Sequence, residues 1–192
     1  MDVEIKDLNK SFGENRVLRD VCAVFPGGRV SAVLAPSGQG KSTLLRILTG
    51  LEKADSGSIS GLPEKMSVLF QEDRLFPQLT AAQNVLALAP KTTRRDDVMR
   101  VLEKLGIVEA ADSPVTELSG GMARRAALAR ALLAESDILF LDEPFRGLDA
   151  ENKARTAQTI REYAAGKTVI LFAHGVEEAE LLGAEFVLEL KH

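Results

Sequence analysis

One stretch of the sequence constrains the fold more than any other: a glycine-rich segment that lies between an apolar run and a helix-like run. Its residues are Ala35, Pro36, Ser37, Gly38, Gln39, Gly40, Lys41, Ser42 and Thr43. They follow the phosphate-loop pattern G-x-x-x-x-G-K-[ST], with alanine in place of the first glycine. Such a loop wraps backbone N–H groups around a phosphate, and the following helix presents its positive N-terminus to the same anion. The pattern predicts that Lys41 adds a positive charge and that Ser42 binds Mg²⁺; the simpler alternative is a Gly/Ser turn with an incidental lysine.

The composition excludes several classes of protein. With 192 residues, the chain suits one domain with room for an inserted subdomain. Its net charge of −4 gives no electrostatic footprint for nucleic acid, so no nucleic-acid partner is expected. The single cysteine, Cys22, fits a reducing compartment, and the N-terminus lacks the pattern of a signal peptide. No apolar run approaches the roughly 20 residues that span a bilayer, so we expect a cytoplasmic protein that reaches a membrane only through a partner.

Candidate strands and helices alternate along much of the chain. Short apolar runs predict strands at 3–5, 16–25, 29–35, 66–70, 137–141, 168–172 and 185–190. Apolar residues at helical spacing predict helices after the phosphate loop and at 80–89, 95–105, 119–134, 150–164 and 176–182. Alternating strands and helices imply crossover connections and a largely parallel sheet. A helical stretch in the middle divides this α/β core into two sequence blocks.

Two further motifs place chemical groups at the ends of these elements. Asp142 and Glu143 follow an apolar strand, and ligands gather beyond the carboxyl ends of buried parallel strands. There Asp142 is placed to hold Mg²⁺ and Glu143 to polarise an attacking water. Ser119 suits a helix N-cap, and Gly120 and Gly121 would let an anion approach the first N–H groups. Taken alone, the two acids fit a solvated turn and the Ser-Gly-Gly segment a plain capped helix; their order after the phosphate loop favours a nucleotide site.

In this order the motifs resemble those of the nucleotide-binding subunit of an ATP-binding-cassette (ABC) transporter, over essentially the whole chain. Residues 118–122 resemble the family's signature motif Leu-Ser-Gly-Gly-Gln, 141–144 its Walker B motif and 147–149 its D-loop. Three single residues match further elements of the family: Phe12 the A-loop aromatic that stacks on adenine, Gln71 the Q-loop glutamine, and His174 the switch histidine.

The resemblance implies an α/β fold, namely a P-loop NTPase core with an N-terminal antiparallel β subdomain and an inserted α-helical subdomain. It implies a single ABC ATPase domain over residues 1–192. In that domain, residues 1–75 and 136–192 form the core with its β subdomain, and residues from about 76 to 135 form the helical subdomain that carries the signature motif. The implied activity is hydrolysis of ATP with Mg²⁺, coupled to transport.

The family's site residues carry over to matching positions of this sequence. Catalytic roles are implied for Lys41, Gln71, Glu143 and His174. ATP contacts are implied for Phe12 and for the whole loop of residues 35–43, and Mg²⁺ contacts for Ser42, Gln71 and Asp142. Two cassettes of this family pair head to tail, so contacts with the ATP held by the partner are implied for Ser119, Gly120, Gly121 and Asp149.

The implied partners are a second cassette, expected to be another copy of this chain, an integral membrane permease and a solute-binding protein. Residues 70–77, 79–80 and 84–85 resemble those of nitrate, sulfonate and taurine importer ATPases. The resemblance therefore implies the ATPase subunit of a small-solute importer, held on the inner face of the cell membrane by its permease. The solute itself does not follow, because such a subunit never touches it.

Three other functions compete with this interpretation. A soluble ABC ATPase that acts on nucleic acid or the ribosome would usually carry a coiled-coil insertion, a second cassette or basic segments. A P-loop small-molecule kinase would lack the Ser-Gly-Gly helix, and a module that has lost hydrolysis would not need Glu143 and His174.

Two local features carry expectations of their own. Ala35 matters only if its position needs a positive φ. The cluster of Arg124, Arg125 and Arg130 after the signature motif is interpreted as a solvated helix face in preference to an anion site.

Overall fold

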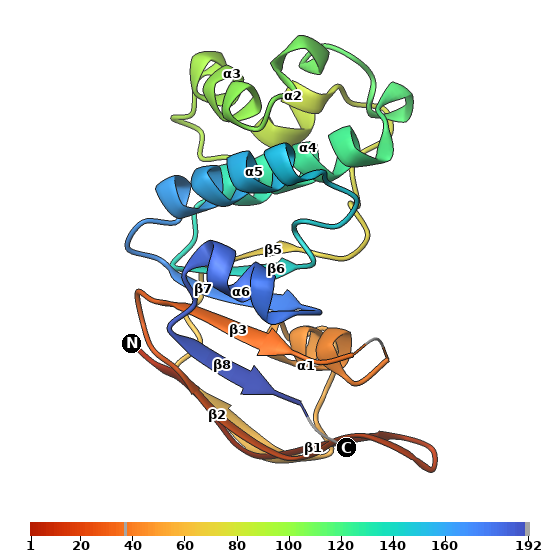
Figure 1. Ribbon diagram of the computed structural model, residues 1–192, viewed down its shortest axis with the longest axis vertical. Coiled ribbons are helices and arrows are strands. Elements are labelled where there is room, and N and C mark those ends of the chain that lie inside the picture. Colours follow the sequence, from red (N-terminus) through yellow and green to blue (C-terminus); the bar gives the residue numbers. More distant parts are fainter. Residues whose placement is uncertain (37, 191–192) are drawn as a thin grey trace.

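A computed structural model describes residues 1–36 and 38–190 of the chain (Figure 1). Its strands are β1 (Val3–Phe12), β2 (Asn15–Phe25), β3 (Val30–Leu34), β4 (Ser56–Ser60), β5 (Met66–Leu69), β6 (Ile138–Asp142), β7 (Thr168–Ala173) and β8 (Phe186–Glu189). Its α-helices are α1 (Lys41–Leu48), α2 (Ala81–Leu86), α3 (Arg95–Lys104), α4 (Gly120–Leu133), α5 (Ala150–Tyr163) and α6 (Val176–Leu182). Short 3₁₀ turns span Val108–Ala110 and Val115–Glu117. Within these described ranges, no helix combines the length and the apolar character that crossing a membrane requires.

A parallel sheet with the strand order β5-β6-β7-β3-β8 lies at the centre of the molecule. β6 and β7 are buried along their whole length, which is why the sequence shows them as continuous apolar runs without alternation. Phe140 and Phe172 belong to the hydrophobic cluster on one face of the sheet, whereas Leu139 and Leu171 belong to the cluster on the other. Since β3, β6 and β7 are parallel, the loops that follow them meet at one edge of the sheet.

One face of the parallel sheet packs against α1 and an antiparallel sheet with the order β2-β1-β4. The predicted N-terminal antiparallel subdomain is therefore confirmed, with two differences. β1 is longer than the predicted strand 3–5, and register shifts interrupt its pairing with β2. β4 was not predicted, because Ile59 is the one apolar side chain in Ser-Gly-Ser-Ile-Ser and gives no alternating pattern; the strand exists through its pairing with β1, in which Ile59 lies opposite Ile5.

The other face of the parallel sheet carries helices (Figure 1). α2 and α3 lie at the end of the molecule away from the antiparallel sheet, and α4 and α5 lie between them and the parallel strands. α4 contacts α2 and α3 on one side and β5 and α5 on the other. This position explains why every residue from Ala126 to Leu132 is buried, since a helix with neighbours all round has no solvated face. The sequence boundaries of the helical subdomain, near residues 75 and 135, stay a prediction.

The interpretation of the arginine cluster on α4 as a solvated helix face is wrong. Arg124 and Arg130 are buried, and Arg125 is partly buried. Each guanidinium donates hydrogen bonds to backbone carbonyl groups of other segments: Arg124 to Phe70 and Glu143, among others, Arg125 to Leu105, and Arg130 to Asp73 and Arg74. Arginine can be buried in this way because its five N–H donors satisfy several acceptors at once. The sequence pattern of alternating charge and alanine could not show where those acceptors come from.

Candidate nucleotide-hydrolysis site

The phosphate loop connects β3 to α1 at the carboxyl edge of the parallel sheet. Gly40 is the N-cap of α1, with φ 89°. A side chain here would clash, because a Cβ atom on Gly40 would lie 2.9 Å from the carbonyl oxygen of Val17 and 2.9 Å from a methyl group of Leu18. Glycine at this position is thus required by both backbone conformation and space. Gly38 also has a positive φ, and the predicted contact at Ser37 lies outside the described residues.

Ala35 does not strain the loop. Among the described residues, the non-glycine positions with positive φ are Asp7, Asp20, Arg74 and Glu143, so Ala35 is not one of them. Its side chain is buried in the hydrophobic cluster that α1 forms with the sheet. The position therefore does not need glycine, and the departure from the pattern leaves the loop geometry intact.

A cavity of about 230 Å³ opens beside the phosphate loop. Residues from the loop, from the ends of β1, β5, β6 and β7, and from the start of β2 line it. They are Phe12, Val17, Gly38, Gly40, Lys41, Ser42, Thr43, Gln71, Glu143 and His174. Apart from Val17, every one of them was singled out from the sequence. The other described residues of the loop, Ala35, Pro36 and Gln39, line an adjoining hollow that also reaches His174. The fold thus brings together residues that are more than 160 positions apart in the sequence.

Lys41, His174 and Glu143 form a chain of polar contacts along this cavity. Lys41 Nζ donates to the carbonyl oxygen of Ala35 and lies 3.3 Å from Nδ1 of His174. Nε2 of the same ring contacts Oε1 of Glu143. A neutral imidazole with its proton on Nε2 satisfies both neighbours, because it then donates to the carboxylate and accepts from the ammonium group. Burial lowers the pKa of Lys41.

Three oxygen-bearing side chains suit a magnesium ion. Ser42, Gln71 and Asp142 line one small hollow of about 90 Å³ next to the main cavity. Burial, followed by the nearby Glu143 carboxylate, raises the pKa of Asp142 to about 6. A buried carboxylate whose charge is so poorly compensated is a fitting ligand for a divalent cation. Mg²⁺ takes few protein oxygens and completes its shell with phosphate and water, which matches this sparse donor set.

Glu143 has an unusual backbone conformation. Its φ is 50°, in the left-handed region that costs a non-glycine residue roughly 1–2 kcal/mol. The conformation is held from two sides, because the N–H of Glu143 donates to the carbonyl oxygen of Phe172 at 2.9 Å and its carbonyl oxygen accepts from Arg124 at 3.1 Å. These contacts aim the buried side chain along the sheet edge toward His174.

Phe12 closes the far end of the cavity with an aromatic face. It is the last residue of β1 and is 50% exposed, so one side of the ring is available for stacking on a base. The ammonium group of Lys10 lies 5.0 Å from the ring centroid and is held there by ion pairs with Glu52 and Asp55. The sequence analysis does not predict that Lys10 lies beside this ring. The spacing of the two residues could have indicated it, because residues i and i+2 of a strand share a face.

The signature residues do not line the cavity. Ser119 is the N-cap of α4, where its side chain accepts from the N–H of Met122 at 3.3 Å. Ser119 and Gly120 are exposed, and beyond the chain neighbours and the backbone of α4 no described atom lies within 4 Å of where a Cβ on Gly120 would be. Asp149 caps α5 in the same way by accepting from Asn152, which lowers the pKa of its carboxyl group. The predicted set therefore divides in two: most residues gather at the phosphate loop, whereas Ser119, Gly120 and Asp149 are exposed, and Gly121 partly exposed, away from it.

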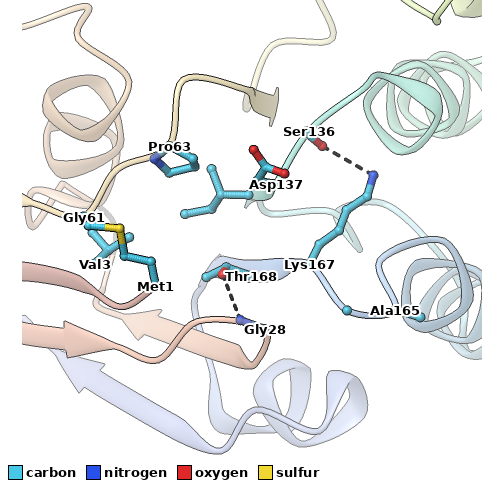
Figure 2. A pocket seen from close by; sticks show the side chains of 12 residues that line it. Met1, Val3, Gly28, Gly61, Pro63, Ser136, Asp137, Ala165, Lys167 and Thr168 are labelled. Carbon is cyan, nitrogen blue, oxygen red and sulfur yellow. Dashed lines mark hydrogen bonds between the residues drawn. The ribbon is translucent and has the colours of Figure 1, made fainter.

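A larger hollow of about 510 Å³ lies at the opposite end of the strands (Figure 2). None of the predicted site residues lines it. Two pairs of its polar groups are bonded to each other, since Lys167 Nζ donates to Ser136 Oγ at 3.4 Å and the N–H of Gly28 donates to Thr168 Oγ1 at 3.0 Å. Size alone therefore does not identify the functional site of this chain.

A parallel sheet with a phosphate loop after β3, acidic residues at the end of β6 and a histidine after β7 defines a P-loop nucleoside triphosphatase. The sequence model described as "ABC transporter" matches residues 18–146. The chain belongs to the ABC transporter family, and its members are ATPases that bind ATP with Mg²⁺.

Curated relatives agree with this family over almost the whole chain. An aliphatic sulfonates import ATP-binding protein, SsuB 1 of Pseudomonas syringae pv. syringae, is 38% identical over 181 residues, which cover 93% of this chain and 76% of the relative. The corresponding SsuB 2 of Paracoccus denitrificans is 40% identical over 191 residues, which cover 98% of this chain and 77% of the relative.

Solved structures agree with the fold. A bacterial ABC transporter cassette, MJ0796, solved as a dimer, superposes with a TM-score of 0.84 at 27% identity, covering 97% of this chain and 94% of that one. The same cassette with ADP and phosphate gives a TM-score of 0.85. An Atm1-family exporter with ATP bound gives 0.88 at 23% identity, where the match covers 37% of the exporter and concerns the fold alone. The predicted α/β cassette fold is thereby confirmed.

Proposed function

We propose that this chain is the ATP-hydrolysing subunit of an importer for a small solute, in which two cassettes pair around two ATP molecules and drive a separate membrane permease. The proposal is carried by one observation: in a member of the ABC family, the ammonium group of Lys41, the carboxylate of Glu143 and the imidazole of His174 meet in one cavity. These are the groups that hydrolysis of a phosphoanhydride needs.

Within one chain the residues divide the work as follows. The loop N–H groups and Lys41 hold the phosphates, and Phe12 stacks on the base. Ser42, Asp142 and Gln71 would hold Mg²⁺, which neutralises the charge that develops on the phosphate oxygens. Glu143 orients and polarises the attacking water, and His174 donates a hydrogen bond to the γ-phosphate. The position of each side chain at the cavity or the neighbouring hollow supports these roles.

Ser119, Gly120, Gly121 and Asp149 act on the nucleotide of the other subunit in this proposal. Their separation from the cavity of their own chain supports it, as does the exposed N-terminus of α4. A helix of this length presents unpaired N–H groups and the positive end of its dipole to an anion. ATP would then hold the two subunits together, and hydrolysis would remove that attraction.

Import is proposed from the relatives, whose names describe import of aliphatic sulfonates. An alkyl sulfonate is accordingly the first solute to test. Transport needs a membrane permease, which would hold the subunit on the cytoplasmic face, and a solute-binding protein that delivers the solute. The surface around Gln71, Arg74 and Phe76 is the proposed permease contact; Phe76 is exposed there, although its side chain is large and apolar.

The central test compares two variants by ATP binding and light scattering. Glu143→Gln should bind ATP, lose at least about 100-fold in kcat and accumulate as a dimer in the presence of ATP. Lys41→Ala should lose ATP affinity and stay monomeric, because the phosphates lose their main positive charge. Normal hydrolysis in Glu143→Gln, or unchanged ATP affinity in Lys41→Ala, would refute the site assignment.

A further inference from the structure

The guanidinium of Arg124 joins two loops of the proposed site. Arg124 lies on the second turn of α4 and is 4% exposed. Its Nη1 donates to the carbonyl oxygens of Phe70 and Gln71 and to the carboxylate of Asp73, and its Nη2 donates to the carbonyl oxygens of Asp142 and Glu143. One planar group therefore binds the segment that contains Gln71 on one side and the end of β6 on the other.

On the first side, Arg124 fixes a segment that has no regular structure of its own. Residues 71–76 form neither helix nor strand, so their backbone carbonyl groups need other partners. Arg124 Nη1 lies 3.3 Å from the carbonyl oxygen of Gln71 and 3.0 Å from Oδ1 of Asp73. Arg130, almost two turns further along α4, donates to the carbonyl oxygens of Asp73 and Arg74 at 2.9 and 2.8 Å. The path of this segment thus depends on where α4 lies.

On the second side, Arg124 fixes the backbone around Glu143. Its Nη2 donates to the two carbonyl oxygens on either side of the N–Cα bond of Glu143, those of Asp142 and of Glu143 itself. These are the two peptide planes that define the left-handed φ of this residue. Since a left-handed glutamate persists only where its surroundings hold it, a shift of Arg124 would turn the carboxylate away from the cavity.

We propose that Arg124 is a positioning residue that couples α4 to Glu143, so that engagement of the α4 N-terminus by the partner's nucleotide sets the direction of the water-activating carboxylate. The proposal rests on the proposed function, which assigns water activation to Glu143 and the trans contact to Ser119. Arg124 lies five positions after Ser119, about 7.5 Å along the helix axis. Every residue of α4 from Ala126 to Leu132 is buried, whereas its first turn, residues 120–123, is exposed or partly buried. A contact at the N-terminus therefore reaches Arg124 through the hydrogen-bonded backbone of little more than one helical turn.

The test is a comparison of Arg124→Lys with Arg130→Lys. A lysine at 124 keeps the charge but has a single nitrogen, so it cannot bind both loops at once. We expect kcat for ATP hydrolysis to fall at least tenfold while KM for ATP changes less than about twofold. Arg130→Lys is the matched control: it disturbs the same helix and the same type of contact, but it touches only the Gln71 side. Its kcat should fall less than about threefold.

A double variant separates positioning from general damage. In Arg124→Lys/Glu143→Gln, the residual rate should equal that of Glu143→Gln within about twofold, because a residue that acts through Glu143 has nothing left to orient. A further large loss would show that Arg124 acts by another route. ATP-dependent dimerisation of the double variant, measured by light scattering, should be retained.

The failure of this inference is distinguishable from failure of the proposed function. If Glu143→Gln hydrolyses ATP normally, the site assignment fails whatever Arg124 does. If Glu143→Gln behaves as expected but folded Arg124→Lys keeps its kcat, only the coupling by Arg124 is refuted. Should Arg124→Lys not fold, Arg124→Gln replaces it, because its shorter neutral amide likewise cannot bind both loops at once. It should lower kcat at least threefold at unchanged KM, and an unchanged kcat there would refute the coupling.

Discussion

Ala35 occupies the position where the phosphate-loop pattern has its first glycine, and its surroundings account for the exchange. The methyl group is buried against the residues that α1 places on the sheet, and the backbone does not adopt a positive φ. Here the side chain stabilises the fold and leaves the phosphate contacts, which come from backbone N–H groups, unchanged.

The variant Ala35→Gly should therefore lose stability without losing function. Removal of a buried methyl group and the added freedom of the unfolded chain together cost about 1–2 kcal/mol. We expect a lower midpoint in urea or heat unfolding and an ATP affinity within about twofold of the parent. A large change in affinity at unchanged stability would contradict this explanation.

Asp142 makes the stability of the metal-free protein depend on pH. Its folded pKa, about 6, lies above the ordinary value of 3.8, so the folded state favours the protonated carboxyl. The stabilisation from this group is complete below pH 4 and is lost as the pH rises through 6.

Asp142→Asn should then raise the unfolding temperature in EDTA at pH 8, and the gain should shrink at pH 5. Calorimetry at both pH values checks this, and a pH-independent difference would refute it. With Mg²⁺ and ATP present, the parent protein should instead be the more stable one.

At the scale of single elements, apolar runs and turn signals predict β6 and β7, because a strand that is buried on both faces is apolar at every position. The sequence does not predict β4, because this strand forms through its pairing with the edge of β1 and not through a pattern of its own side chains. The same division holds for the site. Gly40, Lys41 and Glu143 belong to local motifs and could be found, whereas the contacts of Arg124 come from segments 18 and more residues away and could not.

The turn into α1 provides a prediction at this scale. Gly40→Ala should abolish tight ATP binding and destabilise the protein by more than about 2 kcal/mol, because the new Cβ would press on the backbone of Val17 in addition to the positive φ. Gly38→Ala is the control, since no described atom beyond its chain neighbours lies within 4 Å of its Cβ position. It should cost only about 1 kcal/mol in stability, measured by urea unfolding. Equal losses in the two variants would show that packing against Val17 plays no part.

At the scale of the whole molecule, the arrangement of the site predicts a requirement for two copies. Ser119→Arg in the Glu143→Gln background should bind ATP normally, because its own phosphate loop is intact, yet it should fail to form the ATP-dependent dimer. The bulky cation would lie at the open N-terminus of α4, where the positive end of the dipole disfavours it. Calorimetric titration with ATP and light scattering measure the two properties. Loss of ATP binding in the monomer would mean that Ser119 acts within its own chain.

The burial of α4 on every side has a consequence for sequence variation. In α3, the buried residues Val98, Val101 and Leu102 lie on one face. A saturation mutagenesis scan of α3 should therefore show positions that tolerate substitution alternating with positions that do not, with the period of a helix. In α4, every position from Ala126 to Leu132 is enclosed, and each substitution there opens a cavity or overpacks a neighbour. The scan should show one unbroken intolerant block in that stretch, so the segment least free to vary is a helix of small alanines, not the loop that touches the phosphates.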